Sequence, residues 1–102
     1  MRKAEIYQQG KRAGVLEELE RNRYRFAYAQ GYRGQPISLA LPVRETPYEF
    51  DEFPPVLEGL LPEGPQLEAL LRRYKVDKHD LFQQLLIVGE DVVGSLTIKE
   101  AQ

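Results

Sequence analysis

The chain has 102 residues, of which 42% are hydrophobic and 29% are charged, and its formal net charge is −2. This balance is typical of a soluble globular domain, and the small charge gives no general attraction to nucleic acid or to an anionic membrane. The absence of cysteine excludes disulfides, thiolate nucleophiles and thiolate metal sites. Because no apolar run approaches the roughly 18–20 residues of a membrane span, we expect a single cytoplasmic domain over residues 1–102.

The first part of the chain has the residue alternation of a β-sheet. A strand is predicted over residues 4–9, a turn over residues 10–12, and a second extended run from Val15. Residues 23–28 place aromatic side chains on one face and arginines on the other, which predicts a half-buried antiparallel strand with an aromatic inner face. A further short strand is predicted over residues 37–41.

The middle of the chain turns helical after a predicted polar loop over residues 44–52. Pro54 and Pro55 suit the first turn of a short helix, and Pro62 should end that helix at the preceding leucine. A second helix is predicted from Pro65 onward. Its apolar stripe consists of Leu67, Leu70, Leu71 and Tyr74, against which we expect Leu60 and Leu61 to pack.

A third helix is predicted to begin after Asp77 as its capping residue and to end at Gly89 in a left-handed conformation. The β-rich run over residues 92–98 predicts a late strand that pairs back into the early sheet. The predicted fold class is therefore α+β. It comprises a small antiparallel, partly barrel-like sheet, built from N-terminal hairpins and the late strand, with about three short helices between them.

Residues that could perform catalysis or bind a cofactor are scarce. The single histidine, His79, lies in a predicted first helical turn, where nearby acidic residues are explained by the helix dipole. Glu58 and Glu63 could form an acid–base pair, but nothing in the sequence separates their pKa values. No glycine-rich phosphate-binding motif is present. We therefore predict no catalytic residue, no metal, no cofactor and no enzyme activity.

Two surfaces suggest binding. Arg21, Arg23 and Arg25 alternate with aromatic residues, which would suit single-stranded nucleic acid, but on a strand the rings would face away from the arginines. We favour a solvated row of arginines there, and an RNA-binding module remains the minor alternative. The stretch EGLLPEGPQ at residues 58–66 is a proline-stiffened corner. Its leucines could be core residues, or the corner could be an exposed apolar contact with a low entropic cost of docking.

A series of short motifs in this order resembles the N-terminal subdomain of HipA-type serine/threonine kinases, the toxins of bacterial HipBA toxin–antitoxin modules. The resemblance covers residues 4–98, and its most specific element is the hexapeptide GLLPEG at residues 59–64. The other matching residues are Gly10, Gly14-Val15-Leu16, ISLALP at 37–42, Asp80, Phe82, Leu85-Leu86, Gly89, Asp91 and Gly94-Ser95-Leu96.

The chain stops at Gln102 and lacks the ATP loop, catalytic aspartate and metal-binding residues of a HipA kinase, so kinase activity is not carried over. A separately encoded form of this subdomain is similar to HipS-type antitoxins of HipBST modules. That similarity implies a HipT-like kinase as partner and non-catalytic inhibition near its glycine-rich loop, with a HipB-like DNA-binding protein in a ternary complex. The alternative is a non-inhibitory subdomain that completes a split kinase.

The resemblance also implies a partner-binding surface at and after the GLLPEG motif. A large aromatic side chain at the position after the motif is excluded because Pro65 stands there and the chain has no tryptophan. The contact could instead come from a leucine or from a nearby phenylalanine. The predicted partner-binding residues are Leu61, Pro62, Glu63, Gly64, Pro65, Gln66, Leu67 and Phe53, and residues 63–66 are the expected centre.

Overall fold

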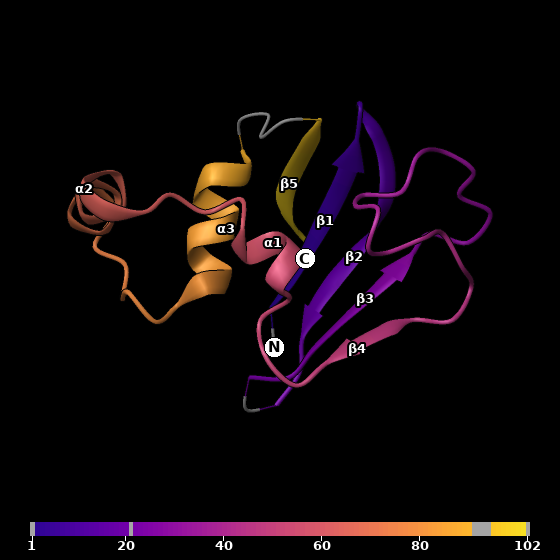
Figure 1. Cartoon of the computed structure of the whole chain (residues 1–102), viewed down its shortest axis with the longest axis horizontal. Coiled ribbons are helices and arrows are strands. Elements are labelled where there is room, and N and C mark those ends of the chain that lie inside the picture. The colour runs from indigo at the N-terminus through magenta and orange to yellow at the C-terminus, as the bar shows by residue number, and fades with distance from the viewer. Residues whose placement is uncertain (1, 21, 91–94, 102) are drawn as a thin grey trace.

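The computed structural model describes residues 2–20, 22–90 and 95–101. An antiparallel sheet carries α1 and α3 on one face, and α2 lies farther out, beyond α3 (Figure 1). The predicted α+β class is confirmed. The strands are β1 (Lys3–Gln8), β2 (Lys11–Glu18), β3 (Tyr24–Tyr28), β4 (Tyr48–Phe50) and β5 (Leu96–Ala101), and the helices are α1 (Pro55–Glu58), α2 (Gly64–Tyr74) and α3 (Leu81–Gly89).

The sheet has the strand order β4-β3-β2-β1-β5, and every neighbouring pair is antiparallel. The last strand returns to the first, with Ile98 opposite Ile6, as the sequence predicts. Residues 92–94 of the predicted late strand lie outside the described residues, and β5 continues to Ala101. The sheet is open, with β4 and β5 at its edges.

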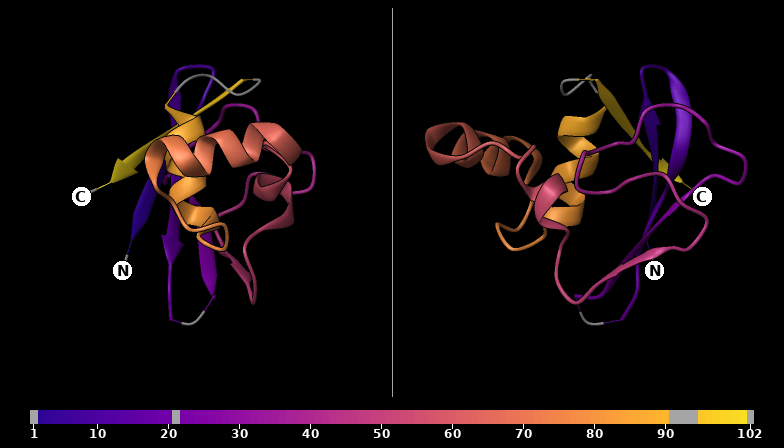
Figure 2. Two further views of the ribbon diagram at one scale, coloured as in Figure 1. Left: turned by 90° about the vertical axis from the view of Figure 1, so that its left-hand side faces the viewer. Right: turned by 45° about the vertical axis from the view of Figure 1, so that its right-hand side comes forward.

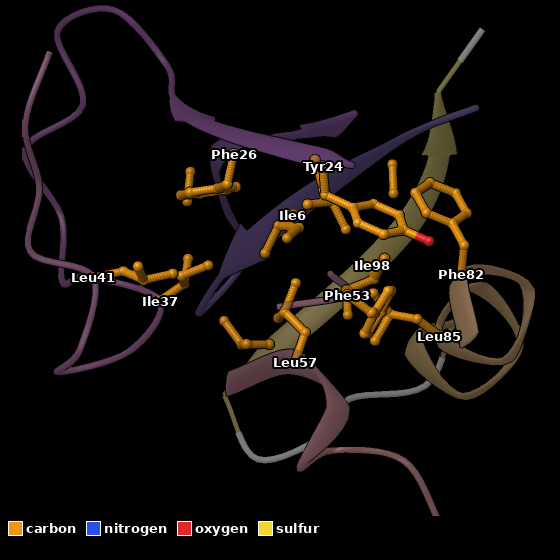
Figure 3. Close-up of a cluster of buried hydrophobic side chains, with 14 of the residues drawn as sticks. Ile6, Tyr24, Phe26, Ile37, Leu41, Phe53, Leu57, Phe82, Leu85 and Ile98 are labelled. Atoms are coloured by element: carbon orange, nitrogen blue, oxygen red, sulfur yellow. The ribbon is translucent and has the colours of Figure 1, made fainter. Parts of the chain in front are cut away.

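The core lies between the inner face of the sheet and the helices α1 and α3 (Figure 3). The predicted aromatic face of β3 is confirmed, because Tyr24, Phe26 and Tyr28 are all buried there. Phe82 and Leu85 of α3 pack into the same cluster and are fully shielded from solvent. Burial of each such side chain stabilises the fold by about 1.5–3 kcal/mol.

Helix α3 ends at Gly89 as predicted, but its capping residue and the conformation of Gly89 differ from the prediction. Asp80, not Asp77, is the capping residue, and its carboxylate accepts a hydrogen bond from the Gln83 amide at 3.1 Å. Gly89 lies inside the helix rather than in a left-handed stop. Its role is close packing, because a Cβ atom on Gly89 would lie 2.4 Å from the Cβ of Ile98 on β5.

Three predictions in the first half of the chain, for the first turn, the strand over residues 37–41 and the loop over residues 44–52, were wrong. The first turn consists of Gln9 and Gly10, both with positive φ, so β2 already begins at Lys11. Residues 37–41 form no strand, because they fold into a turn with a single bridge between Ser38 and Leu41. Conversely, the segment predicted as a polar loop contains β4, which extends the sheet by pairing with β3. In residues 37–41 and in the segment that contains β4, contacts distant in sequence override the local pattern.

Arg2 connects the sheet to the start of α3. Its guanidinium donates hydrogen bonds of 2.8 and 2.6 Å to the Glu18 carboxylate and one of 3.0 Å to Asp80, and it lies 4.9 Å from the centre of the Phe82 ring. The hydrogen bond to Glu18, above all, raises the pKa of Arg2, so the guanidinium stays charged. The capping residue of α3 is thereby fixed to the start of β1.

Candidate partner-binding corner

The corner joins α1 to α2 by a sequence of tight turns. After α1, the amides of Leu60 and Leu61 donate hydrogen bonds of 3.0 Å to the carbonyls three residues earlier, so the chain tightens instead of continuing as an α-helix. The first helix therefore ends at Glu58, earlier than predicted. Gly64 has a φ of +60°, a left-handed conformation that favours glycine, and Pro65 follows in the first turn of α2. The corner thus has one defined shape.

The eight predicted partner-binding residues differ in exposure. Residues 63–66 are all exposed, whereas Leu61, Pro62 and Leu67 are half-buried. Leu60 and Leu61 pack against the edge of the core cluster, as expected of the structural alternative for these leucines. The corner therefore combines both interpretations: its leucines hold it to the core, and its tip faces solvent.

Phe53 stands apart from the other predicted residues because it belongs to the core. It is 6% exposed, and its ring meets that of Tyr24 edge to face at 5.3 Å between centroids. It also lines an open groove of about 470 Å³, together with Glu58 and His79. With 6% of its surface exposed, Phe53 offers little area for a partner contact.

Helix α2 has no buried residue over its 11 positions. Its apolar stripe was predicted to face the protein, yet Leu67, Leu70 and Leu71 are only half-buried and Tyr74 is 49% exposed. Figure 2 shows α2 crossing the outer side of α3, away from the sheet. An amphipathic helix with a half-exposed leucine face is available for a further partner.

The far end of α2 is anchored through a buried amide on α3. The helix ends at Lys75, which has a left-handed φ of 55°, and the chain then returns through Asp77 and Lys78. Gln84 is 1% exposed, and its side-chain amide donates hydrogen bonds of 3.2 and 3.1 Å to the carbonyls of these two residues. The return loop is thereby fixed, which sets the position of α2 although its own side chains are poorly buried.

The other candidate groups do not form a second site with the corner. His79 is exposed, and within the described ranges no three histidine or acidic side chains are placed to hold a metal ion. Arg25 lies 3.6 Å from the Glu49 carboxylate, and Arg23 lies 3.9 Å from that of Asp51. This part of the arginine row is thus partly neutralised, whereas Arg21 lies outside the described residues. No helix in the described part of the chain is long and apolar enough to span a membrane.

Sequence and structure comparisons identify the family. The sequence model described as HipA N-terminal domain matches residues 4–99. The chain belongs to the HipA N-terminal domain family. A curated relative, an uncharacterised protein of Haemophilus influenzae strain Rd, is 31% identical over 100 residues, covering 98% of this chain and 93% of that protein. A solved structure, the N-terminal domain of HipA toxin, superposes with a TM-score of 0.78 at 28% identity, covering 100% of this chain and 94% of that one.

The family membership relates the chain to HipA-type toxin–antitoxin modules. The matched residues 4–99 include the GLLPEG corner. Sequence reasoning found the corner but missed the exposure of the α2 leucines. The difference in apolar content between α2 and α3 could have indicated this exposure. Helix α2 carries a single apolar stripe among polar and charged residues, whereas α3 is apolar on most of its surface. The more apolar helix therefore takes the place on the sheet.

Proposed function

We propose that the chain is a HipS-type antitoxin that binds a HipA-like serine/threonine kinase in the cytoplasm and inhibits it without catalysis of its own. The observation that carries this proposal is the exposed tip, residues 63–66, on a rigid frame beside the half-exposed face of α2. Because the corner is ordered before binding, little conformational entropy is lost on docking. The Haemophilus influenzae relative, matched over 93% of its length, supports the existence of this domain as a separate protein in that organism.

In this proposal, the tip contacts the kinase near its glycine-rich loop and hinders the ordering of that loop or the entry of nucleotide or substrate. Leu61 and Pro62 are half-buried and directly precede the tip. Leu67 follows the tip and is the first residue of the apolar face along α2. A HipB-like DNA-binding protein would join the same complex. The alternative function, a subdomain that completes a split kinase without inhibiting it, predicts the same complex but a different activity.

Co-expression with a HipA-like kinase from the same organism tests the proposal. We expect a complex that survives size-exclusion chromatography, rescue of growth arrest, and reduced phosphorylation by the purified kinase when the chain is added. A complex with unchanged or raised kinase activity would favour the completing subdomain. Absence of both complex and rescue would overturn the antitoxin function.

A matched pair of substitutions locates the contact. Gln66→Arg adds a large charged side chain at the tip, whereas Gln35→Arg makes the same change in the exposed loop between β3 and β4. Both should leave the free energy of unfolding within about 0.5 kcal/mol of the parent, as is usual for exposed positions. We expect Gln66→Arg to weaken kinase binding about tenfold or more and Gln35→Arg to leave it unchanged. Equal affinities for the two variants would remove the tip from the interface.

A further inference from the structure

The connection between β3 and β4, residues 29–47, is unusually long for a compact domain and contains no helix or strand beyond one isolated bridge. Ordered loops of this length are uncommon and are most often functional. It contains the ISLALP segment, residues 37–42, which the kinase-binding corner does not use. In Figures 1 and 2 this loop and α2 lie at opposite ends of the molecule, whose longest extent is 40 Å.

Tyrosine side chains hold this loop in one conformation. The Tyr28 hydroxyl donates to the Leu41 carbonyl and accepts a hydrogen bond of 3.1 Å from the Ile37 amide. The Tyr32 hydroxyl donates a hydrogen bond of 2.6 Å to the Gln35 carbonyl. The Tyr48 hydroxyl donates one of 2.5 Å to the Pro42 carbonyl. Such anchoring fixes the loop before any partner arrives, which lowers the entropic cost of binding.

The fixed loop presents apolar side chains to solvent. Leu39 is 95% exposed and Val43 is 38% exposed, while Ile37 and Leu41 on either side of Leu39 are buried. The Ser38 hydroxyl accepts a hydrogen bond of 3.2 Å from the amide two residues later, which fixes the turn that carries Leu39. A single exposed leucine is ordinary in a folded protein. Here, however, both exposed residues belong to one ordered loop, and Val43 lines a groove.

That groove has a volume of about 630 Å³ and lies between two limbs of the loop, residues 28–33 and 43–45. Arg33 and Arg44 line it, together with one acidic residue, Glu45. Among the described residues, no carboxylate lies within ion-pair distance of either arginine. The groove therefore has a positive balance in a chain whose net charge is negative.

The guanidinium of Arg44 is also held in a fixed orientation. It lies 3.6 Å from the centroid of the Tyr48 ring, and its Nε and Nη2 atoms donate to the carbonyls of Thr46 and Pro47 at 2.9 and 3.2 Å. A guanidinium has five N–H donors, so three remain for an acceptor outside the loop. Carboxylates and phosphates are the acceptors that such a planar donor group binds most strongly, and a carboxylate is the one that an unmodified protein segment supplies.

From these observations we propose that the groove and Leu39 of the same loop form a second docking surface, which binds an acidic segment of a protein partner. Carboxylates of the segment pair with Arg33 and Arg44, and its apolar side chains pack against Leu39 and Val43. Because the surface lies at the end opposite α2, it can be occupied together with the corner. The proposal does not depend on the kinase-binding function.

Nuclear magnetic resonance of the whole ¹⁵N-labelled chain tests this surface directly. The probe is a capped pentapeptide of alternating glutamate and leucine, and its control has lysine in place of glutamate. We expect saturable shifts of the amides of residues 29–33 and 39–45 with the acidic peptide only. No saturation up to about 5 mM peptide, equal binding of both peptides, or shifts confined to other residues would overturn the proposal.

Substitutions then separate this surface from the corner. Arg44→Glu and, independently, Leu39→Ser should each weaken the acidic peptide about fivefold to tenfold, because they remove a charge contact and an apolar contact respectively. Unchanged amide dispersion in their spectra shows that they fold. Gln66→Arg should bind the peptide like the parent chain. A loss of peptide binding in Gln66→Arg, or none in both loop variants, would contradict the assignment while leaving the kinase test unaffected.

Discussion

The sheet with α3 and the corner with α2 differ in how far their apolar side chains are buried. In the first region, Ile6, Phe26, Leu85 and Ile98 have no exposed surface. In the second, a helix with a regular leucine stripe buries none of its residues. The sheet and α3 thus carry most of the stability, whereas α2 and its corner are positioned by their ends and leave an apolar face half-exposed. Substitutions in the two regions should therefore have opposite consequences for folding and for binding.

The largest effect on stability is expected from Phe26→Ala in the sheet. Removal of this fully buried ring should lower the free energy of unfolding by about 3–5 kcal/mol through lost burial and a new cavity. The matched change in the other region, Leu70→Ala in α2, should cost less than about 1 kcal/mol. Urea denaturation measures both. Comparable costs would show that α2 is as much a part of the core as the sheet is.

A smaller effect is expected from Gly89→Ala, where α3 touches β5. Alanine normally favours a helix over glycine by about 1 kcal/mol, so a purely helical effect would stabilise the chain. The new Cβ would lie 2.4 Å from that of Ile98, and we therefore expect a loss of about 1–3 kcal/mol instead. Ile98→Gly removes the Cβ atom that Gly89→Ala would meet, so the double variant should cost less than the sum of the two single variants. A stabilised single variant would disprove the close contact.

Asp80→Ala should lower stability by about 1–2 kcal/mol, because it removes the cap of α3 and one partner of Arg2. Asp80→Asn keeps a capping oxygen and loses only the charge, so its cost should be lower. Because the pKa of Arg2 is raised in the folded chain, its contribution is fully present below the ordinary pKa of an arginine and is lost only above it. Thermal unfolding of both variants measures the difference, and equal costs would assign the whole effect to the ion pair.

The smallest effect concerns pH. Burial raises the pKa of Tyr24 and of Tyr28 above the ordinary value of 10.0. A raised pKa of an acid that is neutral in the folded state gives stability that is fully present below pH 10 and lost as the pH rises through the folded pKa. Tyr24→Phe should therefore reduce the loss of stability between about pH 9 and pH 11. Urea denaturation at both pH values checks this, and an unchanged loss would mean that Tyr24 does not contribute.

The sequence predicted those parts of the fold that depend on local periodicity. The alternation of Tyr24, Phe26 and Tyr28 was sufficient to place β3, and the prolines were sufficient to place the corner. It did not predict the turn around Leu39, because that turn depends on the Tyr28 hydroxyl from a distant strand. It also did not predict the short edge strand β4, which exists through its pairing with β3.

The candidate site was predictable as a segment but not as a surface. The spacing of prolines and glycines indicated a rigid corner at residues 58–66. Which of its residues face solvent depends on the choice of α3, rather than α2, as the helix that covers the sheet. Both helices have apolar side chains that could cover the sheet. The pattern of either helix, taken alone, does not show which of the two does so. Phe53 illustrates the limit: it is near the corner in sequence but lies in the core.

Hydrogen–deuterium exchange of the chain, alone and bound to its co-expressed kinase, tests the central claim most directly. The account predicts new protection at residues 61–74, which have little burial in the free chain, and no change in β1 and β2, which are already protected by the sheet. Protection that leaves residues 61–74 unchanged while the complex is intact would contradict the claim that the corner and α2 meet the kinase.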